Sequence, residues 1–434
     1  MKYYSTRDKN NFVDFSTAVM DGLAKDGGLF MPAEMPFLPS SFIREIEKVS
    51  FQEIGFEIAK RFSGDEIPSG ELKSIIDCAV NFPAPLYELS NDLSVLELFH
   101  GPTLAFKDFG ARFMAKTMGY FAHGLGKELN ILVATSGDTG SAVAYGFYGV
   151  EGINVYLLYP KGKVSLIQEK QLTTLDKNIT ALEVNGTFDD CQRLVKDAFV
   201  DEDLNAKLNL SSANSINIAR LIPQSFYYAN AYRQVKDKSR PVVISVPSGN
   251  LGNITAGLFA KKMGIPIAKF IGATNRNDVF TEYLKTAIFN PRKSVLTLSN
   301  AMDVGNPSNL ERIIELYDED ILKIREDVFS VSYNDEETVV GIKELYEKYK
   351  YIIDPHGAVG YRAWEKFNES NTLKNAYGII VETAHPAKFK EAVEETIGSE
   401  IEIPERLAIC LNKEKRTVEL NCEYSSLKEF LMNL

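Results

Sequence analysis

The chain reads Val242-Val-Ile-Ser-Val-Pro-Ser-Gly-Asn-Leu-Gly-Asn253 and continues as Ile254-Thr-Ala-Gly-Leu-Phe-Ala-Lys-Lys262. A β-rich run leads here into a glycine-rich loop and then into a helical pattern. Glycines let backbone amides converge, and a helix N-terminus adds partial positive charge, so such a loop suits a phosphate group. A plain tight turn explains the same residues equally well.

The same order of strand, turn and helix recurs on both sides of this stretch. Further β-rich runs lie at Leu129–Thr135, Ile153–Tyr159, Ile267–Ile271 and Tyr377–Val381. Strands that alternate with helices predict an α/β fold built from βαβ units with buried parallel sheets. Ligands of such sheets bind where the carboxyl ends of the strands meet the loops. We therefore expect the loops that contain Ser136, Ser248, Gly272 and Thr383 to share one cleft.

The length of 434 residues predicts more than one packed unit, because one hydrophobic core serves roughly 250–300 residues. Residues 1–92 are expected to form a mainly helical N-terminal extension, with helical patterns at Ser40–Lys48 and Phe51–Phe62, each opened by a capping serine. The charged, unpatterned segment Lys236–Arg240 suits a crossing between two α/β units. We predict a smaller α/β domain over 129–237 and a larger one made of 93–128 and 238–434.

Composition excludes several classes of protein. A formal net charge of -11 argues against a nucleic-acid-binding surface, and no apolar run approaches the ~20 residues that cross a bilayer. The four cysteines are scattered, as expected for reduced thiols in a cytoplasmic protein. The histidines are too dispersed for a zinc motif, so we predict no metal; they are His100, His123, His356 and His385.

A second glycine loop, Ser136-Gly-Asp-Thr-Gly140, follows the strand at Leu129–Thr135. Asp138 disfavours a dianionic phosphate in this loop, whereas the backbone amides and the hydroxyls of Ser136 and Thr139 suit a carboxylate. A helix N-cap formed by Asp138 or Thr139 is the simpler local explanation.

Lys107 lies in the stretch His100-Gly-Pro-Thr-Leu-Ala-Phe-Lys-Asp-Phe-Gly110, among apolar neighbours. Partial desolvation by Leu104, Phe106 and Phe109 would lower the pKa of this lysine and leave a neutral amine for Schiff-base chemistry. A lysine that snorkels from a helix edge is the alternative, and this segment alone favours it.

Seven stretches, in this order along the chain, resemble the motif set of the threonine synthase family. They are Gly22–Pro32, His100–Phe113, Ala134–Gly140, Ser211–Arg220, Pro247–Asn253, Asn300–Asn309 and Thr383–Phe389. The resemblance covers nearly the whole chain and points to the longer branch of the family, which carries an N-terminal extension. It implies the tryptophan-synthase-β-like architecture (fold type II) of pyridoxal phosphate (PLP) enzymes, with the cofactor between two doubly wound α/β domains.

The resemblance also implies roles for residues around the cofactor. Lys107 would carry PLP as a Schiff base and act as the catalytic base, and Thr383 would hydrogen-bond the pyridine nitrogen. The cofactor phosphate would lie against Gly249, Asn250, Leu251, Gly252 and Asn253.

Two further groups of residues match substrate sites of the family. Ser136, Gly137 and Thr139 would hold the substrate carboxylate, and Asp138, where many fold type II relatives have asparagine, would face the phenolic oxygen of PLP. Asn214, Ser215 and Arg220 match the site for the substrate phosphate, and a guanidinium suits it because it grips phosphate in a bidentate way.

The activity implied by the resemblance is a lyase reaction that converts O-phospho-L-homoserine and water to L-threonine and phosphate. One alternative is a serine or threonine dehydratase of the same fold, which needs no second phosphate site. Another is a nucleotide-binding α/β protein, although the glycine loops lack both Walker and dinucleotide spacings. We expect a monomer with a small-molecule substrate and no nucleic-acid or membrane partner, a dimer being the alternative.

Overall fold

Strand β10 (Val242–Pro247) is buried along its whole length and lies at the centre of the larger sheet. The fold comes from a computed structural model that describes residues 1–125, 128–135 and 137–434. The sheet has the order β12-β11-β10-β13-β5-β4, in which β4 is antiparallel to β5 and the other neighbours are parallel. Its other strands are β4 (Leu86–Ser90), β5 (Leu93–Glu97), β11 (Lys269–Thr274), β12 (Val328–Ser332) and β13 (Tyr377–Glu382).

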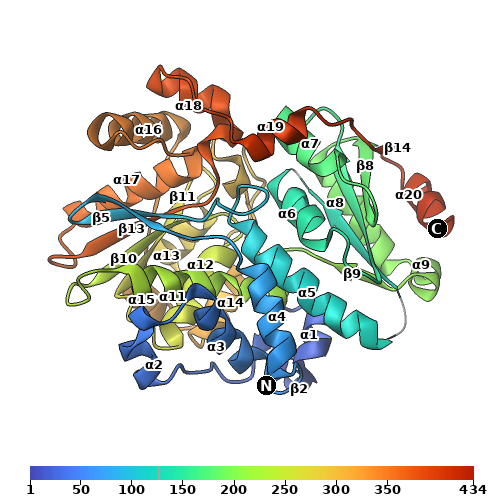
Figure 1. Ribbon diagram of the computed structural model, residues 1–434, viewed down its shortest axis with the longest axis horizontal. Helices are drawn as coiled ribbons and strands as arrows, with labels where there is room; N and C mark the ends of the chain where they lie inside the picture. Colours follow the sequence, from blue (N-terminus) through green and yellow to red (C-terminus); the bar gives the residue numbers. More distant parts are fainter. Residues whose placement is uncertain (126–127, 136) are drawn as a thin grey trace.

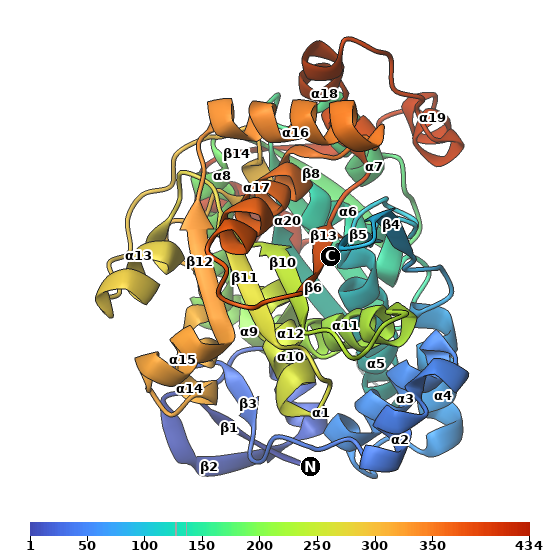
Figure 2. The ribbon, with the colours of Figure 1, turned by 90° about the vertical axis from the view of Figure 1, so that its left-hand side faces the viewer.

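Helices cover both faces of this sheet, which is why its central strands are continuous apolar runs. Helix α17 (Pro355–Glu369) packs across β10, β11 and β13, and it lies in front of the sheet in Figure 2. The other helices of this part are α10 (Ile218–Leu221), α11 (Gln224–Gln234), α12 (Gly252–Lys262), α13 (Val279–Thr286), η2 (Asn300–Met302), α14 (Leu310–Leu316), α15 (Ile321–Asp327), α16 (Asp335–Tyr349), η3 (Pro386–Phe389), α18 (Lys390–Ile397) and α19 (Glu405–Leu411).

A second sheet of five strands is parallel throughout and has the order β14-β8-β7-β6-β9. It lies beside the larger sheet, on the right in Figure 1. Its strands are β6 (Leu129–Ala134), β7 (Ile153–Pro160), β8 (Ile179–Asn185), β9 (Leu210–Ser212) and β14 (Val418–Asn421). The helices near it are α5 (Lys107–Leu125), α6 (Asp138–Phe147), α7 (Leu166–Thr173), α8 (Phe188–Val200), α9 (Glu202–Lys207) and α20 (Tyr424–Met432).

The C-terminal segment departs from the domain division expected from the sequence. The sequence placed residues 418–434 with the larger domain, but β14 pairs with β8, and α20 packs against α8. The chain therefore returns to the smaller sheet at its end, where the C-terminus lies in Figure 1.

The N-terminal part contains the expected helices together with a sheet that the sequence did not predict. Strands β1 (Lys2–Ser5), β2 (Asp8–Asp14) and β3 (Phe30–Pro32) form an antiparallel sheet in the order β2-β1-β3. The helices are α1 (Phe15–Asp21), α2 (Ser40–Arg44), η1 (Ile46–Lys48), α3 (Phe51–Ser63) and α4 (Ser69–Ala79).

The two predicted serine caps of this region had different outcomes. Ser50 begins α3 with a full capping box to Glu53, as predicted. The pattern at 40–48, by contrast, breaks at Glu45 into α2 and η1, and α2 is preceded by Pro39 rather than by a capping serine.

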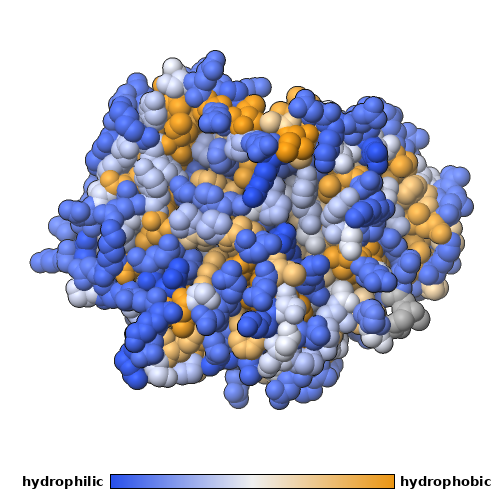
Figure 3. Space-filling view, viewed as in Figure 1, coloured by the Kyte–Doolittle hydropathy of each residue, from blue (hydrophilic) through white to orange (hydrophobic). Residues whose placement is uncertain are grey.

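Apolar side chains on the face shown in Figure 3 form separate patches among polar ones. Within residues 1–125, 128–135 and 137–434, no helix is long and apolar enough to cross a membrane.

Candidate active site

A cleft of about 810 Å³ is lined by residues of both α/β domains. It brings together most of the residues that the sequence singled out, although they come from distant parts of the chain. Those that line it are Lys107, Asp138, Thr139, Asn214, Ser215, Arg220, Gly249, Asn250, Leu251, Gly252, Asn253 and Thr383. Gly137 is not among the lining residues, and Ser136 lies outside the described residues.

Lys107 is the first residue of α5, and the loop before it is hydrogen-bonded to the loop after β13. Phe106 donates its backbone N–H to the Thr383 carbonyl oxygen at 2.8 Å, and His385 donates its N–H to the Leu104 carbonyl oxygen at 3.1 Å. These bonds place Lys107 and Thr383 on neighbouring segments of the cleft wall. Burial lowers the pKa of Lys107 to about 8, which favours a reactive amine over a snorkelling ammonium.

The glycine loop after β10 has space for a ligand group but none for side chains. A Cβ on Gly249 would lie 2.7 Å from Met302 Cα and 3.0 Å from the Ala301 carbonyl oxygen. Leu251 adopts φ of 61°, in the left-handed region, directly before α12. The first turn of α12 therefore opens into the cleft with its backbone N–H groups, the geometry that binds phosphate.

Asn253 adds an oriented donor to this loop. Its Oδ1 accepts hydrogen bonds from the hydroxyls of Tyr227 and Tyr228, each at 2.6 Å. The amide is thereby fixed, and its buried Nδ2 has no hydrogen-bond partner among the described residues. An acceptor on a bound ligand would satisfy it.

A second set of anion-binding groups lies on α10 and on the segment before it. Arg220 is 3% exposed and donates from Nη1 to the Ala213 carbonyl oxygen at 2.8 Å. Its Nε is buried without a partner, and the described part of the chain offers it no carboxylate ion pair. Burial lowers the pKa of Arg220 to about 10. A buried guanidinium in this state is a binding group for an anion.

Asp138 does not cap its helix, contrary to the local expectation. Gly137 precedes α6 with φ of 143°, and Asp138 is the first helical residue, with no side-chain cap on the helix. Its Oδ1 instead lies 2.6 Å from Lys388 Nζ and accepts a hydrogen bond from Gln168 Nε2 at 3.2 Å. Lys388 lies 250 residues further along the chain, so no local pattern indicates this ion pair.

Among the four histidines, His356 is the one that lines the cleft. Its Nε2 accepts a hydrogen bond from the Ala301 N–H at 3.2 Å, so Nδ1 carries the proton and faces Asp354 Oδ1 at 3.0 Å. His356 thus supports the segment that packs on Gly249. His100 pairs with Glu97, and His385 caps η3. In the described ranges, no cluster of potential ligands could hold a metal ion.

The site fits PLP on grounds of its own chemistry. It combines a lysine of lowered pKa with a cradle at Gly249 that any Cβ would fill, and with an unpartnered amide donor on Asn253 at a helix N-terminus. A protein-family sequence model described as "Pyridoxal-phosphate dependent enzyme" matches residues 82–382. The chain is a PLP-dependent enzyme of fold type II.

Two further family models and two similar curated proteins identify the family within this class. Models of the threonine synthase N terminus and C-terminal region match residues 2–80 and 357–431. The chain is 44% identical to threonine synthase of Escherichia coli K12, with all of both chains covered, and 37% identical to that of Schizosaccharomyces pombe, covering 92% and 90%. The chain belongs to the threonine synthase family.

Solved structures agree with this assignment. The crystal structure of threonine synthase from E. coli superposes with a TM-score of 0.91, covering all of both chains at 44% identity. PLP-bound threonine synthase from Brucella melitensis gives 0.94 at 34% identity, covering 100% of this chain and 99% of that one. Threonine deaminase of Solanum lycopersicum, at 17% identity and a TM-score of 0.58, shares the fold alone.

Proposed function

We propose that the chain converts O-phospho-L-homoserine and water to L-threonine and phosphate at this cleft. The observation that carries the proposal is Arg220, a buried guanidinium that lines the cleft with its Nε unpartnered by any described residue. Arg220 belongs to a different segment from the glycine loop at Gly249–Asn253, so the cleft offers two sets of anion-binding groups. A substrate that carries its own phosphate needs both, whereas a dehydratase of free serine or threonine needs one.

The cofactor would be held by three groups of the chain. Lys107 would attach to it through Nζ, the loop Gly249–Asn253 would bind its phosphate, and the Thr383 hydroxyl would bond the pyridine nitrogen. When bound, PLP supplies an electron-withdrawing ring that stabilises negative charge at the substrate α-carbon.

The substrate would be held at its two charged ends. Backbone amides and the hydroxyls of Ser136 and Thr139 would bind the carboxylate, while Asn214, Ser215 and Arg220 would bind the γ-phosphate. Because both the carboxylate and the γ-phosphate are held, the α-carbon between them would lie close to Lys107.

Lys107 would then move protons. Its lowered pKa leaves a fraction of the free amine neutral near pH 7–8, so Nζ accepts the α-proton. Loss of a further proton from the β-carbon accompanies expulsion of phosphate from the γ-carbon. The γ-carbon then takes up a proton, water adds its hydroxyl at the β-carbon, and a proton returns to the α-carbon. Arg220 favours the expulsion because it offsets the charge of the leaving phosphate.

The direct test is to mix the pure protein with phosphohomoserine and to measure both released phosphate and L-threonine, with threonine deamination as the competing assay. Stoichiometric phosphate and threonine are expected. Ammonia release from threonine as the faster reaction would contradict the proposal. Lys107→Ala is expected to abolish the visible absorbance of the covalently bound cofactor, and persistence of that band would move the attachment to another residue.

The kind of substrate, the oligomeric state and the cellular location complete the proposal. The substrate is a small molecule, and we propose that the protein acts as a 48.5 kDa monomer in the cytoplasm. Light scattering on the purified protein measures the mass directly, and a value near 97 kDa, twice the chain mass, would establish the dimer instead. Cell fractionation tests the location.

A further inference from the structure

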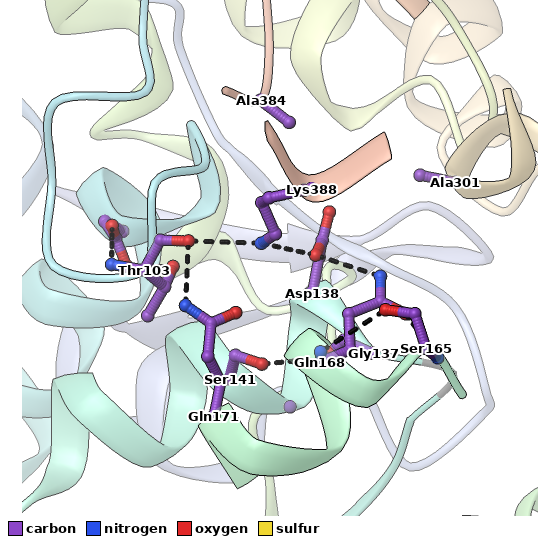
Figure 4. A network of polar contacts seen from close by, with 12 residues as sticks. Thr103, Gly137, Asp138, Ser141, Ser165, Gln168, Gln171, Ala301, Ala384 and Lys388 are labelled. Atoms are coloured by element: carbon purple, nitrogen blue, oxygen red, sulfur yellow. Dashed lines mark hydrogen bonds and ion pairs between the residues drawn. The ribbon is translucent and has the colours of Figure 1, made fainter. Parts of the chain in front are cut away.

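Lys388 and Asp138 form an ion pair in the wall of the cleft, and both side chains are almost completely buried. Nζ and Oδ1 are 2.6 Å apart, at side-chain exposures of 0% and 6%. Figure 4 shows Lys388 approaching Asp138 from the segment at η3, while Gln168 approaches the same carboxylate from α7. Lys388 also donates to the Thr103 carbonyl oxygen at 3.1 Å, and Gln171 donates to the same oxygen at 3.3 Å.

A structural role does not account for this pair by itself. Burying two charges costs more free energy than their attraction returns in many proteins, and an apolar pair of similar volume is often at least as stable. Asp138 lines the cleft together with Lys107, so the pair is part of the electrostatic surroundings of the catalytic amine.

One nearby anion and two nearby cations act on the Lys107 amine. Asp138 is the anion whose attraction raises the pKa of Lys107, whereas Arg220 and Lys388 lower it, and burial, the largest effect, lowers it as well. Asp108, on α5, is a second carboxylate near Lys388: burial raises its pKa to about 6, whereas the bonds that both of its oxygens accept from Thr103, and the charge of Lys388, act in the opposite direction. The state of the Lys107 nitrogen therefore depends on whether the Asp138 charge is already matched.

We propose that Lys388 is a positioning residue that neutralises Asp138, so that Asp138 does not hold a proton on the Lys107 nitrogen. The pair then presents to the cofactor a fixed, electrically balanced group. Gln168 donates to Oδ1 of Asp138, the same oxygen that Lys388 contacts, and Gly137 is required because any Cβ there would lie 2.4 Å from Gln168 Cδ. The inference rests on the cofactor assignment at Lys107 and not on the identity of the substrate.

The test uses the full-length holoenzyme of four variants: Lys388→Met, Asp138→Asn, the double variant, and Lys390→Met as a matched control. Lys390 lies two residues away, forms a half-buried pair with Glu394 and does not line the cleft. The visible absorbance of the bound cofactor is recorded against pH, because its midpoint reports protonation of the Lys107 nitrogen.

Opposite shifts are expected. In Lys388→Met the unmatched carboxylate raises the midpoint by about 1 to 3 pH units, the usual effect of one nearby opposite charge. In Asp138→Asn the unmatched ammonium lowers it, and the double variant returns close to the parent, as does Lys390→Met. Shifts of the same sign, or a Lys388→Met profile equal to that of Lys390→Met, would overturn the proposal.

Loss of folding or of cofactor in Lys388→Met is also informative. The double variant removes the unmatched charge, so recovery of the folded, coloured protein supports the proposal, and failure to recover overturns it. The absorbance midpoint is independent of the substrate added. A wrong substrate assignment therefore leaves this result intact, and a failure here leaves the phosphohomoserine assay unaffected.

Discussion

Asn250 donates from Nδ2 to Ser215 Oγ across 2.8 Å, and this bond joins the two proposed phosphate sites. Asn250 is fixed from its other side as well, because its Oδ1 accepts from the Ser308 N–H at 2.7 Å and its carbonyl oxygen accepts from Asn309 Nδ2 at 3.0 Å. Because of this bond, we expect a change at the substrate site to affect the cofactor site as well.

Ser215→Ala is expected to weaken both sites modestly. Loss of one hydrogen bond is worth ~0.5–1.5 kcal/mol, so we expect KM for phosphohomoserine to rise by roughly 2- to 12-fold. Dissociation of PLP should accelerate by a comparable factor, measured by the decay of visible absorbance in the presence of a PLP trap. Ser239→Ala, in an exposed loop, is the control. A change in KM with unaltered PLP retention would contradict the prediction, because it would show that the bond between Asn250 and Ser215 does not couple the two sites.

Arg220→Met should weaken substrate use while leaving PLP bound. A charge-assisted hydrogen bond contributes ~1.5–3 kcal/mol, which corresponds to a loss of about 10- to 100-fold in kcat/KM. Arg220→Lys keeps the charge but loses the bidentate geometry, so an intermediate loss is expected. Steady-state kinetics with phosphohomoserine, together with the cofactor absorbance, measure both properties. Unchanged kinetics in the methionine variant would place the substrate phosphate elsewhere.

The pKa of Lys107 predicts how the cofactor-free chain recaptures PLP. Burial holds this pKa at about 8, and only the neutral amine attacks the aldehyde. Below pH 8 the rate should fall by about tenfold per pH unit, and above pH 8 it should level off. Stopped-flow absorbance between pH 6 and 9.5 gives the profile. A rate that still rises about tenfold per pH unit at pH 9.5, as the ordinary lysine value of 10.5 requires, would show that the amine is not desolvated.

Features within short segments could be predicted from the sequence. The strand, glycine loop and helix at 242–262 and the start of α3 at Ser50 follow from local patterns, and the structure has them. The expected shared cleft is lined at Asp138, Ser248 and Thr383, but the segment at Gly272, which belongs to β11, does not line it. Lys107 illustrates the limit, since its own segment favours a snorkelling lysine over a reactive one. Its environment is set by Thr383 and Asp138, which are distant in the chain.

Pairings between distant segments were missed for the same reason. The strand β14 carries no pattern that names β8 as its partner, and the short polar strand β2 has little apolar alternation to mark it. The pair of Asp138 and Lys388 depends on how η3 folds back over α6. An aspartate after glycine at a helix start suggests a cap, and only the tertiary contact shows that its charge is used elsewhere.

Glu382 is expected to make the free energy of unfolding depend on pH. It ends β13 fully buried, with Oε1 accepting the Asp354 N–H at 2.8 Å and Oε2 lacking a partner among the described residues. Burial first, and then the charge of Asp354, raises the pKa of Glu382 well above its usual 4.5. The folded chain thus retains a proton that the unfolded chain releases above pH 4.5. The resulting stability is full below pH 4.5 and is lost as pH rises towards the raised folded pKa.

Glu382→Gln removes this titration while keeping the shape of the side chain. The variant should gain stability relative to the parent as pH rises, by up to about 1.4 kcal/mol for each pH unit in the window between the unfolded and folded pKa values. Urea unfolding at pH 5.5, 7 and 8.5 measures the difference, with the exposed Glu395→Gln as the control. If the free energies of unfolding of the parent and Glu382→Gln stay parallel across this range, Glu382 is ionised in the folded protein and its pKa is not raised.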